Sequence, residues 1–124
     1  MNGDVIHLQL PARPDYILAV RLAVSAVAQR VGFDIEDIED LKVASAEACT
    51  LLLAGRPQMI DISLTVDDGL VMEFEASGFS DGAADADEPD GMSQYLLDAL
   101  VDTCEIKDDG GVIHGVRLKK TLLY

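Results

Sequence analysis

The stretch Val-Ala-Ser-Ala-Glu-Ala-Cys-Thr-Leu-Leu-Leu-Ala, from Val43 to Ala54, holds a single charged residue, Glu47, among apolar and small side chains. On a helix, Glu47 shares one stripe with Asp40, Ala44, Leu51 and Ala54. An isolated charge in apolar surroundings is costly, so we expect Glu47 to reach a polar partner or to open into a cleft. The alternative interpretation is a carboxylate on the least buried stripe of a packed helix.

Two helices are predicted around this stretch. The first opens at Pro14-Asp15, carries apolar residues at helical spacing to about Val31, and is ended by Gly32. Asp34 is the predicted N-cap of the second helix, which continues through Glu47 to Leu53.

The rest of the chain predicts strands and one more helix. A short strand covers residues 5–10, and the alternating residues 60–66 and 70–74 form a hairpin around Asp67-Asp68-Gly69. Residues 92–101 form a third helix, and a second hairpin joins 104–107 to 112–122. The predicted fold is therefore α+β, a two-layer sandwich of a mainly antiparallel sheet with the helices on one face.

Composition agrees with one domain over residues 1–124, because 124 residues that are 49% hydrophobic can build a single core. The net charge of −14, from 9 basic and 23 acidic residues, argues against direct nucleic-acid binding and favours a protein partner with basic patches. Because the chain shows neither a membrane-spanning apolar run nor an export signal, we expect a cytoplasmic location. Cys49 and Cys104 lack metal-ligand spacing and are interpreted as buried thiols, so no metal site is predicted.

Acidic residues gather before the third helix. Five carboxylates without any base fall among glycine, alanine and proline in the segment around 79–91, namely Asp81, Asp85, Asp87, Glu88 and Asp90. Such a segment buries too little apolar surface to offset its ordering entropy, so we expect a mobile loop. A plain acidic surface loop fits the composition equally well.

The run from Tyr16 to Thr50 resembles the bacterial anti-sigma factors that are also serine kinases, regulators of general-stress and sporulation sigma factors. The resemblance rests on the order of charged, small and apolar residues in both helices, and downstream on Gly78-Phe79, Gly91 and the terminal strand that ends Val116-Arg117-Leu118-Lys119-Lys120. It implies a histidine kinase-like ATPase fold of the Bergerat type, with the segment around 79–91 as a lid over the nucleotide. It also implies that Glu47 is the general base of phosphoryl transfer.

The resemblance fails at the positions that hold nucleotide in this family. Leu51 stands where an asparagine coordinates Mg²⁺, and leucine has no oxygen for a cation that prefers oxygen ligands. Gly78 is present, but Ala76 stands where an aspartate accepts the adenine amino group.

Two further elements depart from the family pattern. In the glycine-rich turn that cradles phosphates, Gly91 is retained, while Ser93 stands where close backbone approach favours glycine. Gly115 corresponds to a threonine that closes the adenine pocket, in an alignment that allows a slip of one position. The acidic residues beside the pocket would also repel triphosphate.

These departures predict a binding module that acts by contact with a sigma factor or an anti-anti-sigma protein, without ATP turnover. No cofactor is expected. Arg21 is the candidate partner contact, since it matches a helix that the family uses for binding; an ordinary solvated cation is its alternative. The family's pairing and the apolar first strand and first helix predict a homodimer.

Two other functions remain open. The first is an active ATP-dependent serine/threonine kinase that phosphorylates an anti-anti-sigma factor and uses ATP and Mg²⁺, with Glu47 as its base. The second is a phosphatase-complex or sensor subunit that shares only the scaffold.

Overall fold

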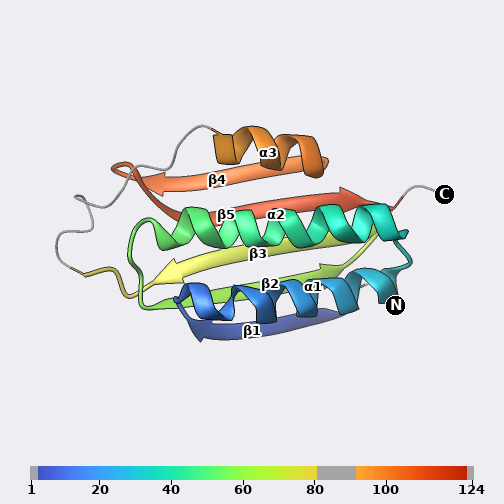
Figure 1. Cartoon of the computed structure of the whole chain (residues 1–124), viewed down its shortest axis with the longest axis horizontal. Helices are drawn as coiled ribbons and strands as arrows, with labels where there is room; N and C mark the ends of the chain where they lie inside the picture. The colour runs from blue at the N-terminus through green and yellow to red at the C-terminus, as the bar shows by residue number, and fades with distance from the viewer. Residues whose placement is uncertain (1–2, 81–91, 123–124) are drawn as a thin grey trace.

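A computed structural model of the chain describes residues 3–80 and 92–122. These residues form a five-stranded antiparallel sheet in the order β1-β2-β3-β5-β4, with the helices packed on one face (Figure 1). The strands are β1 (Val5–Pro11), β2 (Met59–Val66), β3 (Gly69–Ser77), β4 (Thr103–Asp109) and β5 (Val112–Thr121). The helices are the 3₁₀ turn η1 (Pro14–Tyr16), α1 (Ile17–Val31), α2 (Ile35–Leu53) and α3 (Met92–Leu100). The predicted α+β two-layer architecture is confirmed.

The two long helices are bounded by the residues that the sequence indicates. Gly32 ends α1 in the left-handed conformation, with φ of 111°. Asp34 caps α2, and its carboxylate accepts a hydrogen bond of 2.8 Å from the backbone N–H of Asp37. The predicted first helix is divided, because Tyr16 N–H bonds to the carbonyl of Arg13 three residues back and so makes the separate turn η1.

Both predicted hairpins are present. In the first, Ile62 of β2 lies opposite Phe74 of β3, and both side chains are buried beneath the helices. In the second, β4 pairs with β5, and the register shifts between Lys107 and Asp108. Because of this irregularity, Ile113 and Val116 of β5 both pack toward the core although they are three positions apart.

The core lies between the helices and the inner face of the sheet. Its largest fully buried side chains come from both layers: Phe74, Leu41, Leu52, Ile60, Ile62, Leu64, Leu70, Met72, Leu97, Leu118, Val20 and Val24. Burial of this apolar surface supplies the main stabilisation of the fold.

Lys120 on β5 ties the end of α3 to α2. Its ammonium group donates a 2.9 Å hydrogen bond to the carbonyl of Leu100 in the last turn of α3. It also lies 3.5 Å from a carboxylate oxygen of Asp37 and 3.8 Å from one of Asp40, both on α2. A cation at a helix C-terminus is favourable, so Lys120 helps to set the position of α3 beside α2.

Candidate functional site

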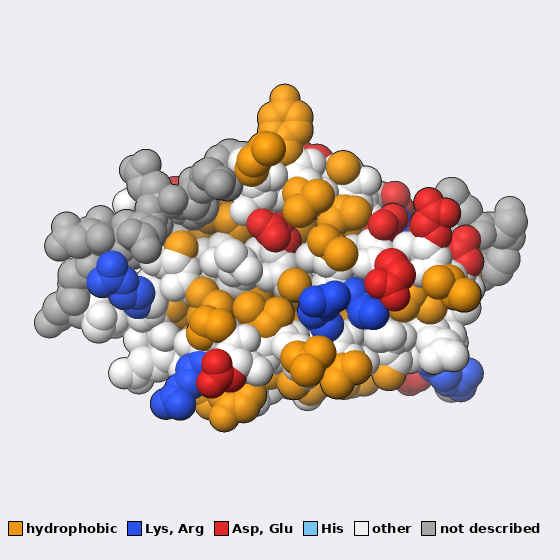
Figure 2. Space-filling model, viewed as in Figure 1, with side chains coloured by type: hydrophobic (Ala, Val, Ile, Leu, Met, Phe, Trp, Pro, Cys, Tyr) orange, Lys and Arg blue, Asp and Glu red, His pale blue; other side chains and the backbone are white. Residues whose placement is uncertain are grey.

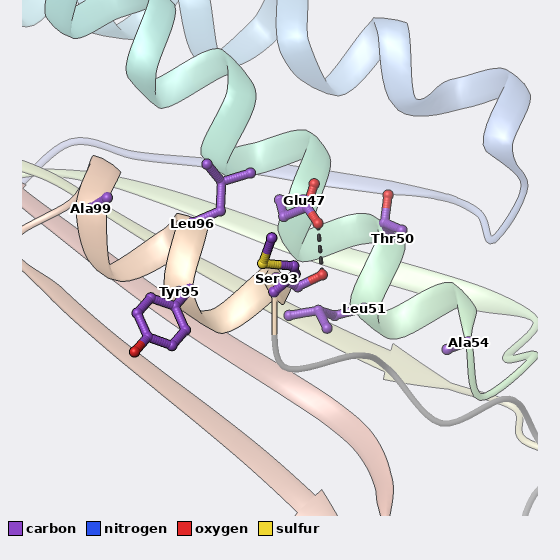
Figure 3. A pocket seen from close by; sticks show the side chains of 9 residues that line it. Glu47, Thr50, Leu51, Ala54, Ser93, Tyr95, Leu96 and Ala99 are labelled. Carbon is purple, nitrogen blue, oxygen red and sulfur yellow. Dashed lines mark hydrogen bonds between the residues drawn. The ribbon is translucent and has the colours of Figure 1, made fainter.

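A cavity of about 610 Å³ lies between α2 and α3. Both helices supply its walls: Glu47, Thr50, Leu51 and Ala54 from α2, and Met92, Ser93, Tyr95, Leu96 and Ala99 from α3. Figure 3 shows Glu47 and Ser93 pointing toward each other where the two helices meet. Among the described residues, the walls are therefore mainly apolar side chains, and the carboxylate of Glu47 lies at the edge.

Glu47 is half-buried and faces this cavity. Its Oε1 accepts a hydrogen bond of 2.7 Å from the hydroxyl of Ser93, which is only 8% exposed. Glu47 thus has both a polar partner and an open cleft, as the sequence predicts for a lone carboxylate in apolar surroundings.

Leu51 lies one helical turn after Glu47 and also lines the cavity. Its side chain is 3% exposed and belongs to the hydrophobic core. The neighbouring hydroxyl, on Thr50, donates a 3.0 Å hydrogen bond to the carbonyl of Ala46 in its own helix. The stretch of α2 beyond Glu47 therefore presents mainly hydrocarbon to the cavity.

Ala76 and Gly78 lie at and after the end of β3. Ala76 is half-buried against the core, and Gly78 has a left-handed backbone with φ of 75°. A Cβ atom at Gly78 would lie 2.8 Å from the Cβ of Gln58, so glycine is required there by space as well as by conformation. Neither residue is among the described residues that line the cavity.

The structure does not bring Gly115 to the cavity. Gly115 pairs with Glu75 and Lys107 in the sheet, and a Cβ atom built on it would approach the Lys107 side chain at 3.4 Å, on the open face of the sheet. Gly115, which the sequence predicts to be a remnant of the adenine pocket, therefore faces away from the helices and from the cavity. Its neighbour Val116 faces the core instead. Gly91, and the acidic segment from 81 onward, lie outside the described residues.

Arg21 lies on α1 rather than on the cavity wall. Its side chain is half-buried, and its Nε is buried without a hydrogen-bond partner among the residues that the structure describes. Two apolar neighbours on the same helix are largely exposed, Leu18 at 63% and Leu22 at 61%. The cation therefore sits on an uncovered, partly apolar surface of α1.

The sequence interpretation missed the contribution of α3 to the cavity. Met92, Tyr95, Leu96 and Ala99 recur at spacings of three and four residues, so they form one apolar stripe of the helix. Met92 and Tyr95 are 72% and 80% exposed, and Figure 2 shows apolar side chains gathered on this side of the helical layer. The periodicity of residues 92–101 was a sufficient signal for this stripe.

The two cysteines take no part in the cavity wall. Cys49 on α2 is 1% exposed, and burial raises the pKa of its thiol to about 12. Cys104 on β4 is half-buried, and its pKa is raised by burial and by the nearby carboxylates of Asp98 and Glu105. The prediction of buried thiols is confirmed for Cys49 and holds in part for Cys104.

Within the described ranges, no cluster of side chains suited to a metal ion occurs and no helix is long and apolar enough to cross a membrane.

Comparison with known proteins places this geometry in a family. Residues 10–120 match the family model described as the histidine kinase-like ATPase domain. Since the match spans the three α-helices, the cavity and nearly all of strands β2 to β5, the chain belongs to the histidine kinase-like ATPase domain family.

Within that family the chain is a homologue of the serine-protein kinase RsbW. It is 31% identical to RsbW of Halalkalibacterium halodurans, over 89% of this chain and 80% of that protein. It is 29% identical to RsbW of Bacillus cereus, over 88% of this chain and 81% of that protein.

A solved structure shares the fold. The crystal structure of the RsbU and RsbW domains of a Mycobacterium tuberculosis protein superposes with a TM-score of 0.68 at 17% sequence identity, over 95% of this chain. This chain spans only 32% of that longer chain. At this identity the likeness shows the fold alone.

Proposed function

We propose that this chain is a regulatory module of the anti-sigma type, which binds a sigma factor or an anti-anti-sigma protein in the bacterial cytoplasm and does not turn over ATP. Homology to RsbW over most of both chains supports the regulatory role. The exposed apolar surface on α1 and α3 supports action by protein contact.

One observation is the main support for the proposed loss of ATP turnover. Leu51 stands one turn after Glu47 on the wall of the cavity, where the resembled kinases place an asparagine, and it is packed into the core. Mg²⁺ requires oxygen ligands at near-ideal octahedral positions, and a leucine side chain supplies none.

The other described residues of the cavity fit Mg-ATP no better. Among the described residues, the lining holds no lysine or arginine that could pair with phosphate, and the charge on Glu47 has the same sign as phosphate. One carboxylate oxygen of Glu47 already accepts a hydrogen bond from the hydroxyl of Ser93. Magnesium and nucleotide are therefore not part of the proposed function.

Calorimetric titration with Mg-ATP tests this proposal. We expect a Kd no tighter than about 1 mM, against the micromolar affinity typical of working sites, a difference of about 4 kcal/mol. RsbW of Bacillus cereus serves as the positive control in the same buffer. The double variant Leu51→Asn, Ala76→Asp should recover part of the affinity, with Leu53→Asn as the matched control. A micromolar Kd for the unaltered chain would contradict the proposal.

Arg21 is the proposed partner contact. The guanidinium of half-buried Arg21, whose Nε has no partner among the described residues, can pair with a carboxylate of a partner. In a pull-down from a bacterial lysate with partners identified by mass spectrometry, Arg21→Ala should reduce recovery of the bound sigma factor or antagonist. Arg30→Ala, an exposed cation near the other end of α1, should leave recovery unchanged.

Glu47 supports a second candidate, an active serine kinase, because the carboxylate is retained and reaches a hydroxyl. Transfer of labelled phosphate from ATP to an anti-anti-sigma protein, abolished in Glu47→Gln, would establish this alternative.

A further inference from the structure

The carboxylate of Glu47 stands apart from the other acidic groups of its helix. On α2, Glu39 pairs with Lys42 at 3.1 Å, and Asp37 and Asp40 lie near Lys120. Glu47 has no ion pair within the part of the chain that the structure describes; its recorded partner is the neutral hydroxyl of Ser93. A hydroxyl satisfies a lone pair without cancelling the charge, so the edge of the cavity keeps a net negative charge.

The walls beside this charge are hydrocarbon. Leu51 and Ala54 supply one side, and Leu96 and Ala99 supply the other. In Figure 3, Leu51 lies next to the pair of Glu47 and Ser93, and Leu96 projects from α3 toward α2. A ligand that fits must therefore carry a positive group on an apolar stem.

The hydrogen-bonding groups favour a donor. The second oxygen of Glu47 is an acceptor, and the Ser93 hydroxyl, having given its proton to Glu47, has only lone pairs to offer. A guanidinium or an ammonium group brings several N–H donors, and its methylene stem packs along apolar surface while the charged end reaches the polar edge. An anion would meet the like charge of Glu47 at this edge.

We propose that the cavity between α2 and α3 binds a basic side chain, arginine or lysine, from a protein partner, with Glu47 as the counter-charge and Ser93 as the second acceptor. The inference rests on the proposed function, because the protein partner supplies the basic residue. The net charge of −14 is complementary to such a partner. In this proposal the cavity binds a cationic side chain in place of an anionic nucleotide.

Small probes test the site without a partner or a nucleotide. Butylguanidinium reproduces an arginine side chain, and butylurea has the same shape without the charge. Titration of each into the full ¹⁵N-labelled chain, followed by two-dimensional NMR, should show butylguanidinium shifting the amide signals of Glu47, Leu51, Ser93 and Leu96. We expect butylurea to bind at least about tenfold more weakly, because it lacks the charge-assisted bond.

Two variants distinguish binding in the cavity from general attraction of a cation to an acidic protein. Glu47→Gln should weaken butylguanidinium about tenfold. Glu75→Gln removes the same charge from an exposed position on β3 and should have no such effect. Added salt at 1 M should weaken binding by the unaltered chain and bring it close to that of Glu47→Gln.

Three results would overturn the inference: equal binding of butylguanidinium and butylurea, equal weakening by Glu47→Gln and Glu75→Gln, or shifts of the same four signals by Mg-ATP at micromolar concentration. The comparison of the two probes needs no variant, so it remains decisive even if Glu47→Gln fails to fold. A failed pull-down would count against the proposed function and leave the probe result standing. Loss of probe binding with intact partner binding would remove only the cavity assignment.

Discussion

At the scale of single residues, the same helix holds two acidic groups in opposite environments. Glu47 faces a cavity and accepts a hydrogen bond from a hydroxyl. Cys49, two positions later, points into the core, and burial raises the pKa of its thiol to about 12. A helix places neighbouring side chains about 100° apart, so two residues can differ this much in solvation within half a turn.

The pKa of Cys49 predicts a loss of stability at high pH. The thiol ionises near pH 9.0 in the unfolded chain and near 12 in the folded protein, so above pH 9 the unfolded state releases a proton that the folded state retains. The unfolding free energy should therefore be about 1.4 kcal/mol lower at pH 10 than at pH 7.

Urea unfolding of the chain and of Cys49→Ala at both pH values measures the effect, with Val24→Ala as the control, since it removes buried atoms but no ionisable group. The stability of the unaltered chain relative to Cys49→Ala should fall by about 1.4 kcal/mol between pH 7 and pH 10, whatever the variant costs at pH 7. A difference that stays constant between the two pH values would contradict a buried thiol with a raised pKa.

At the scale of the elements, the position of α3 decides the shape of the site. This short helix brings Ser93 to Glu47 and supplies the apolar stripe of the cavity. Its other end is held by Lys120 through the Leu100 carbonyl, and by packing of Leu97 into the core. A nine-residue helix is not stable alone in water, so these tertiary contacts determine where it lies.

Removal of the Lys120 ammonium group should therefore loosen α3. We expect Lys120→Met to lower the unfolding free energy by about 1–3 kcal/mol, because it leaves the Leu100 carbonyl without its donor and two carboxylates of α2 without a nearby cation. Lys119→Met changes a neighbouring lysine whose backbone pairing places it on the other face of the sheet, and it should cost less than about 0.5 kcal/mol.

Chemical denaturation gives the stability change, and hydrogen exchange at the amides of α3 locates it. Exchange in α3 should accelerate more than exchange in β2 and β3. An unchanged exchange rate in α3 would show that packing of Leu97 alone positions the helix.

At the scale of the whole molecule, apolar surface remains uncovered at one edge of the sheet and on α1. Val5 on the edge strand β1 is 48% exposed, and Leu18 and Leu22 are more than half exposed. Exposed edges and apolar patches of this kind are typical of association sites.

We expect a homodimer through β1 or α1, with Arg21 near its rim. Light scattering at micromolar concentration should give about twice the mass of one chain. The double variant Leu18→Asp, Leu22→Asp should give a monomer if α1 forms the interface. Ile35→Asp, which alters an 81% exposed residue at the start of α2, should leave the mass unchanged. A monomeric mass for the unaltered chain would remove the predicted homodimer and leave the fold in place.

The sequence by itself determined the helices and the strands, and it indicated that Glu47 needs a polar partner or a cleft. The N-cap at Asp34, the left-handed glycine at Gly32 and the alternation along β2 are signals carried within a few residues, so they can be read without the fold. A lone carboxylate in an apolar helix likewise demands a partner wherever the helix packs.

Only the tertiary structure decided which partner Glu47 has and what the site contains. Ser93 is 46 positions away from Glu47, and their contact depends on the packing of α3 against α2 and on the anchor at Lys120. The direction of Gly115 depends on the β3–β5 register, in which Gly115 lies opposite Glu75 on the face away from the helices. Sheet register and helix packing arise from the sum of many distant contacts, so no local pattern in the sequence could specify either of them.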